Sequence, residues 1–509
     1  FYRYQIPFSA ASAKVNFADA ATQIAQKSYT INAVHIKLTL YIIASQSYSY
    51  GSIPRFILLG VLMSFSPLDS DLLGPLFTTK EMRDALSERR FLGLMLRVET
   101  ALARAQAAEG LVSQELANSI AGIDPGSLDI KVLAEQTRLG AVPVIPFVKS
   151  VQAMLPPDVA GGFHFGTTSQ DIMDTAIILQ MAKAVDLIET DLRALLSSLC
   201  ELAEEHCETP CIGRTAGQHA SPVTFGFKVA GWCVAIAEHL AQVEQLKRRV
   251  LVLSLAGPVG TLTQMGDRAG AVVTRTAADL GLAVPAMPWH THRSRIVELG
   301  SWLAILLGIL AKMATDVVHL ATSEVGEVSE PAVAGRGGSS AMPHKRNPVG
   351  SMIILAQHSA SVGHLSTLVS AMASLHERPV GAWHSEWLAL PSLVGLAAGA
   401  LREARLLAGG LEVDAARMYR NIELTNGMIF SDAVAGGLAQ AMGRAEAYTA
   451  VEEEVANVVR SGGHLRERLT KRFPAHHSTI LQAFELAPAI NAAASRCRAA
   501  LISVRKQLA

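Results

Sequence analysis

The chain has 509 residues, of which 50% are hydrophobic and 17% are charged. Because a single hydrophobic core usually stops growing at roughly 300 residues, this length predicts two or three domains. Lysine plus arginine and aspartate plus glutamate are equal at 44 each, which excludes a global charge that would attract nucleic acid or an anionic membrane. The apolar excess favours an oligomer with much surface buried between helices or subunits.

Residues 1–65 differ in character from the rest of the chain. They contain aromatic and β-branched runs such as TLYIIASQSYSYG and show no helical period. The chain begins with Phe1, and Met63 precedes SFSPLDSDLLGPLF, so we interpret this stretch as an extension upstream of the natural start. Its apolar runs come late and are interrupted by polar, Gly and Pro residues, which does not fit a signal peptide.

Helices are predicted over most of the remaining sequence. Apolar residues recur at steps of three and four between Lys80 and Gly110, and shorter helical segments follow to about Pro157. Beyond this point the helices become long, and there is scarcely a strand signal. The long helices are predicted at residues 172–206, 222–255, 297–325, 349–375 and 386–407.

These patterns predict an all-α protein built around an elongated bundle of five long helices. Its most apolar stretch, residues 299–318, is interrupted by Lys312 and Asp316, so we interpret it as a helix buried on all sides rather than a membrane span. Shorter helices near the C-terminus indicate a separate small domain. The predicted organisation is an extension at 1–65, an N-terminal helical domain at 66–163, the bundle at 164–407 and a C-terminal helical domain at 408–509.

The five cysteines favour a reducing compartment. Their number is odd and they lie mostly in helical patterns, which fits buried thiols in a cytoplasmic protein. His206, Cys207 and Cys211 have a spacing that zinc tolerates, but no second Cys/His pair follows at a finger-like distance. We therefore interpret these residues as a helix end with ordinary thiols, and no metal site is predicted.

Polar residues gather in three segments that lie between long helices. In the first, GFHFGTTSQDIMDTA, several hydroxyl groups and unpaired backbone N–H groups at a helix start suit a carboxylate ligand. Helix capping alone explains the same pattern. The residues concerned are His164, Thr168, Ser169, Gln170 and Asp171.

The second segment, GRTAGQHASPVTFGFK, places an arginine and a histidine just before a helix, and a purely structural histidine is the alternative interpretation. The third, VAGRGGSSAMPHKRNPVGS, combines glycines with a cationic cluster, which indicates either a mobile lid over an anionic substrate or a solvated basic loop. The second segment offers Arg214, Thr215, Gln218 and His219. The third offers Ser339, Ser340, Met342, His344, Lys345, Arg346 and Asn347.

The motif GSSAMPHKRNP resembles the signature loop of the fumarase/aspartase superfamily almost letter for letter. TSQDIMDTA and GRTAGQHASP resemble the other two shared regions in the expected order, so the resemblance extends from about Ser66 to the C-terminus. It implies an enzyme without cofactor or metal, a homotetramer whose helices form a twenty-helix core, and active sites assembled from three subunits. Members remove a proton α to a carboxylate and expel a group from the β carbon.

The resemblance also implies residue roles. Ser339 corresponds to the proposed base, and Lys345 and Asn347 correspond to residues that hold the substrate carboxylate and stabilise the aci-carboxylate intermediate. We expect proton transfer from Ser339, or from Lys345 acting with it, with His219 as an alternative donor. Substrate contacts are expected of His164, Thr168, Ser169, Gln170, Arg214, Thr215, Gln218, Ser340, Met342, Asn347 and Arg378.

Smaller features point to one branch of the superfamily. LHERPVGAWHSEW, PWHTHRSRIVE and LEVDAARM resemble the bacterial 3-carboxymuconate cycloisomerases of protocatechuate degradation in the β-ketoadipate pathway. Typical lyases carry a histidine after Arg-Thr that is proposed to protonate the leaving group, but Ala216 stands there in this chain. A carboxylate has a pKa of about 4 and needs no such proton. Intramolecular addition of a carboxylate to an alkene is therefore the expected reaction.

One departure and two alternatives accompany this expectation. Ser294 stands where related cycloisomerases are expected to carry an acidic residue, which we interpret as a variation in a subsite. An adenylosuccinate lyase-like C–N lyase is the alternative enzyme, and Ala216 argues against it. A non-catalytic, crystallin-like structural protein is the alternative outside enzymes, and the joint presence of Ser339, Lys345 and Asn347 argues against that.

Overall fold

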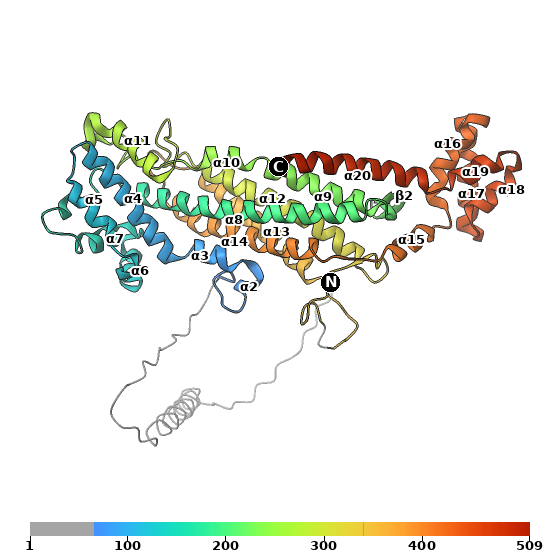
Figure 1. Cartoon of the computed structure of the whole chain (residues 1–509), viewed down its shortest axis with the longest axis horizontal. Coiled ribbons are helices and arrows are strands. Elements are labelled where there is room, and N and C mark those ends of the chain that lie inside the picture. Colours follow the sequence, from blue (N-terminus) through green and yellow to red (C-terminus); the bar gives the residue numbers. More distant parts are fainter. Residues whose placement is uncertain (1–65, 339–340, 509) are drawn as a thin grey trace, which may run out of the picture. The chain divides into compact units, whose positions relative to one another are not determined.

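The structure is a computed structural model that describes residues 66–338 and 341–508 (Figure 1). The predicted extension at 1–65 and the paired serines Ser339 and Ser340 lie outside the described residues. The described chain is built mainly of α-helices, as the sequence predicts. Its 3₁₀ turns are η1 (Pro125–Ser127), η2 (Ala160–Gly162), η3 (Thr263–Arg268), η4 (Met428–Phe430) and η5 (Pro474–His476).

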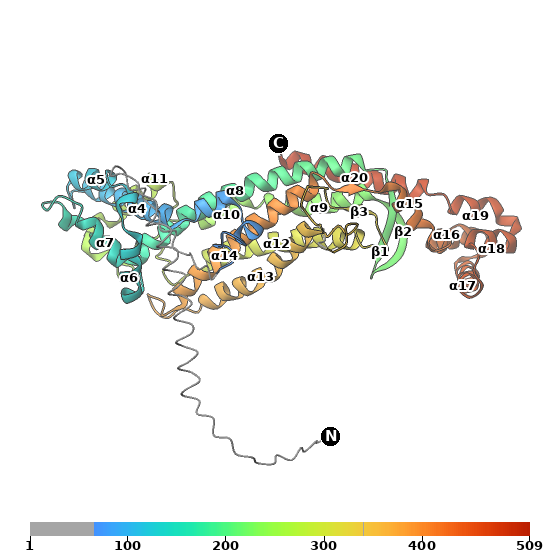
Figure 2. The ribbon, with the colours of Figure 1, turned by 90° about the horizontal axis from the view of Figure 1, so that it is seen from below.

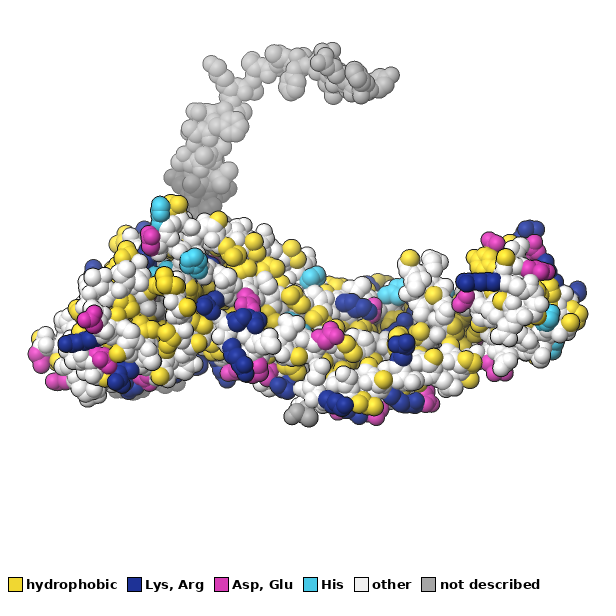
Figure 3. Space-filling view, turned by 90° about the horizontal axis from the view of Figure 1, so that it is seen from above, with side chains coloured by type: hydrophobic (Ala, Val, Ile, Leu, Met, Phe, Trp, Pro, Cys, Tyr) yellow, Lys and Arg dark blue, Asp and Glu magenta, His cyan; other side chains and the backbone are white. Residues whose placement is uncertain are grey.

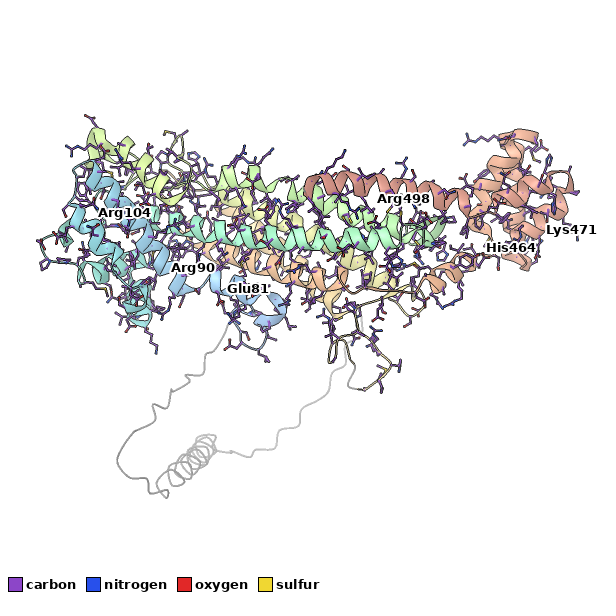
Figure 4. The ribbon with its side chains drawn as sticks, viewed as in Figure 1. Glu81, Arg90, Arg104, His464, Lys471 and Arg498 are labelled. Atoms are coloured by element: carbon purple, nitrogen blue, oxygen red, sulfur yellow. The ribbon has the colours of Figure 1, made fainter. Side chains whose placement is uncertain are left out.

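Short helices pack around α4 in the N-terminal segment. Ser87 caps α4 by accepting a hydrogen bond from the Arg90 N–H, and the helix packs against α5, α8 and α11. Arg104 of α4, labelled in Figure 4, forms an ion pair with Asp279 of α11 at 3.3 Å. The helices of this segment are α2 (Gly74–Phe77), α3 (Lys80–Ala85), α4 (Glu88–Ala108), α5 (Gln114–Ala121), α6 (Ile130–Gly140), α7 (Val144–Gln152) and α11 (Ala269–Leu280).

Long helices lie side by side in the central bundle (Figures 1 and 2). α8 has 37 residues and buries Ile188, Leu192 and Leu195, whose spacing of three or four places them on one stripe. α12, α13 and α14 pack against one another, while α8 packs against α9 and α14. The bundle helices are α8 (Ser169–Glu205), α9 (Phe225–Leu240), α10 (Val243–Val250), α12 (Ser294–Leu320), α13 (Val349–Ala371), α14 (Ala382–Ala408) and α20 (Ala487–Leu508).

The segment after α8 corrects the sequence-based prediction, which placed a loop there and began a helix at Pro222. Residues 210–224 form an antiparallel hairpin instead. α9 begins only at Phe225, because Thr224 ends the strand and caps the helix by accepting a hydrogen bond from the Phe227 N–H. The two strands are β1 (Pro210–Thr215) and β2 (Gln218–Thr224).

The helix predicted at 222–255 is also divided in two. At the end of α9 the Gln242 N–H bonds to the His239 carbonyl, a 3₁₀-type spacing that interrupts the α-helical ladder before α10 begins. No glycine or proline marks this break, so the sequence pattern does not show it. The other four long helices form close to their predicted positions.

The apolar helix α12 belongs to the core of the bundle. It is long and apolar enough to cross a membrane, but 56% of its most apolar window is buried within the structure. It is not buried on all sides, because Ile305 and Lys312 are exposed on one stripe. Trp232 of α9 donates a hydrogen bond to Asp316 of α12 at 2.9 Å. These contacts fit a core helix of a soluble protein.

A second, smaller core lies in the C-terminal part of the chain and includes Val434, Leu438, Val451 and Ile480. α20 leaves this core and packs along α9 and α8, where Arg498 pairs with Glu208 (Figure 4). The domain boundaries at 163 and 407 stay a prediction. The remaining elements are β3 (Val328–Ser329), which pairs with β4 (Glu412–Val413), and α15 (Ala415–Glu423), α16 (Ser431–Met442), α17 (Arg444–Ser461), α18 (Leu465–Arg472) and α19 (His477–Ala483).

Charged side chains are mixed on the surface. Figure 3 shows acidic and basic groups interspersed across the visible face, with no broad area of one sign among the described residues. This distribution agrees with the equal numbers of cationic and anionic residues in the sequence. Any site for an anionic ligand must therefore be built locally from a few donors.

Candidate active site

The first polar segment forms the beginning of α8. Asp171, in the first turn, is fully buried, and its carboxylate binds the start of the helix to two distant loops. Thr168 and Ser169 lie half-buried beside it. Asp171 therefore caps the start of α8, and the hydroxyl side chains of Thr168 and Ser169 remain at the candidate site. The donors to Asp171, at 2.7 to 3.0 Å, are Thr167 Oγ1, His290 Nε2 and the backbone N–H groups of Thr168, Ala256 and Gly257.

Gln170 holds Arg378 in place at the same end of α8. The Gln170 amide is fully buried and donates to Asp174 at 3.1 Å and to the His290 carbonyl at 2.9 Å, while its Oε1 accepts from Arg378 at 2.9 Å. Arg378 also donates to the Pro258 carbonyl at 2.7 Å. Because the amide of Gln170 is engaged on both sides, its geometry suits positioning Arg378 better than contacting a substrate directly.

A buried ion network that the sequence-based analysis missed lies beneath this cluster. Arg293 donates to Asp174 at 2.7 Å and to Glu386 at 2.6 Å, so it joins the N-terminal ends of α8, α12 and α14. Trp383 donates to Asp174 at 2.9 Å. Burial lowers the pKa of Arg293, but the two carboxylates more than offset this and raise it overall. Burial raises the pKa of Glu386, against the opposing effect of Arg293.

His164 faces a second buried carboxylate. Its Nδ1 lies 2.5 Å from Oε1 of Glu99, which belongs to α4 and is fully buried. The backbone of His164 has a φ of 62°, a left-handed conformation that is uncommon for a residue other than glycine. His164 was predicted from the sequence as a site residue, but Glu99 was not. A single Glu in an apolar helix does not indicate which residue it pairs with.

The second segment forms the β1–β2 hairpin at the other end of α8. Arg214 binds Glu327 through both guanidinium nitrogens, at 3.0 and 2.5 Å, and Asn421 donates to the same carboxylate at 2.7 Å. Glu327 is fully buried, so the charge of Arg214 is largely compensated within the chain. Glu327 was not predicted from the sequence, because its only signal in SEVGEVSEP is its proximity to other carboxylates.

The turn of this hairpin contains Ala216, which stands where typical lyases of the superfamily carry a histidine. Thr215 pairs with Gln218 across the strands, and the two residues between them, Ala216 and Gly217, have φ values of 49° and 81°. Two positive φ values define a type I′ turn, for which Asn-Gly is the usual sequence signal. The pKa of His219 is lowered, first by burial and then by the nearby positive charge of Arg214.

The third segment is a loop closed at its base. The Asn347 N–H donates to the Gly337 carbonyl at 2.8 Å, so the two ends of the loop meet at these residues. Gly337 has a φ of 71°, and a Cβ at this position would lie 2.7 Å from the Asn347 carbonyl oxygen. Met342, Lys345 and Asn347 line a cavity of about 1160 Å³ with the end of α12 and the start of α15.

Three glutamates bind arginines at the two ends of this loop. At the N-terminal end, Arg336 forms an ion pair with Glu403 of α14 and lies near Glu330. At the C-terminal end, Arg346 binds Glu412 through both guanidinium nitrogens at 3.0 Å and donates to the Glu330 carbonyl at 2.7 Å. The hydrogen bonds from Arg346 hold the pKa of Glu412 down at about 2. Arg346, although cationic, is thus engaged in anchoring.

The described site residues fall into two groups at opposite ends of α8. With 37 residues at ~1.5 Å each, α8 separates them by about 55 Å. Ser339 and Ser340 lie outside the described residues. One end holds His164, Thr168, Ser169, Gln170 and Arg378. The other holds Arg214, Thr215, Gln218 and His219, next to Met342, Lys345 and Asn347.

The part of the chain that the structure describes was expected to hold no metal ion. Across residues 66–338 and 341–508, no three His, Cys, Asp or Glu side chains lie together in a way that could hold a metal ion. The absence of a metal and of a cofactor stays a prediction.

The helical bundle, the polar segments at its helix ends and the glycine-rich loop beside a cavity agree with the lyase-type enzyme that the sequence predicts. The sequence comparison agrees, since residues 77–362 match the family model described as "Lyase". This range covers more than half of the chain. The chain belongs to this lyase family of the fumarase/aspartase superfamily.

Relatives narrow the position within the family. The 3-carboxy-cis,cis-muconate cycloisomerase of Pseudomonas aeruginosa is 44% identical over 77% of this chain and 86% of its own length. The nitrosuccinate lyase of Streptomyces davaonensis is 42% identical over 75% of this chain and 82% of its own. The crystal structure of the 3-carboxy-cis,cis-muconate lactonizing enzyme from Pseudomonas putida superposes with a TM-score of 0.82 at 39% identity, covering 86% of this chain and 100% of that one. The fold predicted from the sequence is confirmed.

Proposed function

We propose that this enzyme converts 3-carboxy-cis,cis-muconate to a carboxymuconolactone. One carboxylate of the triacid attacks an alkene carbon of the same molecule and forms the ring C–O bond. The displaced π electrons pass to the carbon α to another carboxylate, giving an aci-carboxylate, and a proton is then delivered to that carbon. The attacking carboxylate loses its charge in the ester bond, so at neutral pH the isomerisation takes up one proton from solution and consumes no other molecule.

The observation that carries this proposal is Ala216 at the tip of the hairpin. In the typical lyases that the sequence resembles, a histidine at this position is proposed to protonate the leaving group. A methyl group cannot donate a proton, so the chain suits a reaction whose attacking or departing group is already a stable anion. A carboxylate meets that requirement at neutral pH.

The remaining roles are proposed from the resemblance to the superfamily, with support from His219 and Lys345. His219 has a lowered pKa, which leaves its imidazole neutral near pH 7 and a weak acid. This supports Ser339, or Lys345 acting with it, as the source of the proton. Lys345 lines the cavity beneath the loop, where an ammonium group can also stabilise the developing negative charge.

We propose that the enzyme is a cytoplasmic homotetramer whose active sites take residues from different subunits. The two groups of site residues lie too far apart within one chain to contact one small triacid. α13 supports assembly, since Val349–Ala371 contains no charged residue and exposes Met352, Val362 and Val369. All five cysteines are buried free thiols, which supports a reducing compartment.

A second candidate is the elimination of nitrite from nitrosuccinate. The Streptomyces davaonensis relative with that name is nearly as similar to this chain as the cycloisomerases are. Nitrite is also a weakly basic anion, so its departure requires no acid at the position of Ala216. Adenylosuccinate, whose leaving group is an amine, is the substrate that Ala216 disfavours.

Turnover assays separate these candidates. The purified protein is incubated with 3-carboxy-cis,cis-muconate, nitrosuccinate and adenylosuccinate in turn, and the conjugated diene, nitrite and the released amine product are followed. We expect rapid loss of the diene only. Release of nitrite without loss of the diene would establish the second candidate in its place, and turnover of adenylosuccinate alone would reject both.

Replacement of Ser339 by alanine tests its assigned role. The proton-transfer assignment predicts a fall in kcat on the order of 10² or more, because a positioned acid or base typically contributes that much. Size-exclusion chromatography should show an unchanged assembly. Full activity in Ser339→Ala would leave Lys345 or His219 as the proton donor, and Lys345→Met then distinguishes the two.

Co-expression of two inactive variants tests the shared site. Arg378→Ala damages one end of α8 and Lys345→Ala damages the other. If each site combines ends from different subunits, random mixing restores about a quarter of the sites, because each end is intact half of the time. If both ends served one site within a single chain, the mixture would stay as inactive as either variant alone.

A further inference from the structure

Glu99 and His164 join two separate elements at the start of α8. Glu99 lies in the middle of α4 with its side chain 1% exposed, and its Oε1 is 2.5 Å from Nδ1 of His164. The imidazole remains 18% exposed on its other side. Carboxylates this deeply buried are rare unless they are paired, and residues in left-handed conformations such as His164 concentrate at functional sites.

The charges around His164 favour its protonated form. Burial lowers the pKa of the imidazole, but the charge and hydrogen bond of Glu99, together with the charge of Asp171, more than offset this and raise it overall. Glu99 on α4 and Asp171 on α8 are the charged groups that act on this imidazole, and both are anionic. Asp171 is already satisfied by its own hydrogen bonds, whereas Glu99 pairs with His164.

The protonated ring has a free donor. Nδ1–H donates to Glu99, so Nε2–H is the remaining donor, and it has no hydrogen-bond partner within residues 66–338 and 341–508. His164 precedes Thr168 and Ser169 by only a few residues, at the end of the bundle that also holds Arg378. A charge-assisted donor at this place suits a carboxylate of the ligand.

We propose that Glu99 is a positioning residue that orients His164 and keeps it cationic, so that His164 Nε2 binds one carboxylate of the substrate. The inference rests on the proposed function only in taking the ligand to be a polycarboxylate. Glu99 does not contact the ligand. Its contribution is to keep the imidazole charged at a pH where a similarly buried histidine would be neutral.

The test compares Glu99→Gln with the wild-type assembly at two pH values. Glutamine keeps the shape and still accepts from Nδ1–H, but without the carboxylate the effect of burial dominates and His164 becomes neutral near neutral pH. Binding of propane-1,2,3-tricarboxylate is measured by calorimetry at about pH 5 and about pH 7. We expect Glu99→Gln to match the wild type at the lower pH and to bind about tenfold more weakly at the higher pH.

Two further variants exclude a merely structural effect. Glu109→Gln removes a carboxylate from the end of the same helix, where Glu109 pairs with Arg275 at 2.8 Å, and should leave the pH dependence unchanged. Glu99→Asp restores the charge and should recover part of the binding at about pH 7. Equal weakening of Glu99→Gln at both pH values, or no weakening at either, would overturn the proposal.

A third variant covers the case in which Glu99→Gln fails to fold. His164→Gln leaves Glu99 in place and should bind the tricarboxylate weakly at both pH values; binding equal to that of the wild type at the higher pH would overturn the proposal. The outcome is independent of turnover. A protein that binds the tricarboxylate in this Glu99-dependent way but does not consume 3-carboxy-cis,cis-muconate rejects the proposed reaction alone.

Discussion

Arg293 affects the candidate site indirectly, through other buried residues, and is not placed to contact a substrate. Its guanidinium is almost fully buried between Asp174 and Glu386, and Asp174 in turn binds Gln170, which holds Arg378. The position of Arg378 therefore depends on a chain of buried hydrogen bonds. In a low-dielectric interior each member of such a chain is costly to leave without a partner.

Removing the guanidinium tests this dependence. Arg293→Met leaves Asp174 and Glu386 buried without their cation, so we expect a loss of about 3–5 kcal/mol in the free energy of unfolding. Thermal or denaturant unfolding measures the loss. Asp84→Asn, which breaks the exposed pair between Lys80 and Asp84, serves as the control and should leave the free energy of unfolding nearly unchanged.

At the residue scale the sequence predicted which side chains matter better than it predicted their partners. Arg214, Gln170 and Arg346 were each identified as polar residues in shared motifs. Their bonds to Glu327, Arg378 and Glu412 join positions that are 66 to 208 residues apart in sequence, and such pairings leave no local pattern. Several polar side chains that were expected to bind the substrate instead form hydrogen bonds and ion pairs with other residues of the chain.

Helices were more predictable than the segments between them. The long helices show in the spacing of apolar residues, because one stripe of each faces the core. The β1–β2 hairpin was missed because its strands are short and its turn is Ala-Gly rather than Asn-Gly. The glycine-rich loop was identified by its motif, but the hydrogen bond between Gly337 and Asn347 that closes its base is a feature of the fold alone.

Gly337 and Gly338 form a matched pair for testing that closure. Gly337→Ala would place a Cβ 2.7 Å from the Asn347 carbonyl and strain a left-handed residue, so the base of the loop must open. We expect a fall in kcat/KM on the order of a hundredfold with little change in Tm. Gly338→Ala meets no atom within 4 Å and should cost far less. Similar losses in both would show that base closure is unimportant.

At the scale of the whole molecule, α13 has an exposed apolar surface that the fold of a single chain does not explain. Val362 is 59% exposed on a helix without Asp, Glu, Lys or Arg, whereas the face of the protein seen in Figure 3 carries interspersed acidic and basic groups. Burial of this face between copies would bring helix ends from different chains together. The proposed tetramer thus accounts for an apolar surface and for a divided site at once.

A charge on this face tests the assembly. Val362→Glu should dissociate the tetramer and abolish turnover while leaving the helical content of each subunit intact, because an unpaired carboxylate cannot be buried between copies. Analytical ultracentrifugation and circular dichroism measure the two effects. Val459→Glu, at a position of α17 that is 73% exposed, is the control and should remain a fully active tetramer. An active Val362→Glu monomer would refute the shared site.

The uninterrupted length of α8 has a consequence for how such an enzyme can change. Each inserted residue would rotate everything beyond it by about 100° and advance it by ~1.5 Å, turning the hairpin away from whichever neighbour it must meet. The length of α8 fixes the distance between the two groups of site residues, and this distance must match that of the neighbouring copies in the proposed tetramer. Insertions and deletions are therefore expected to accumulate in the surface loops and to be absent from the span between Ser169 and Glu205.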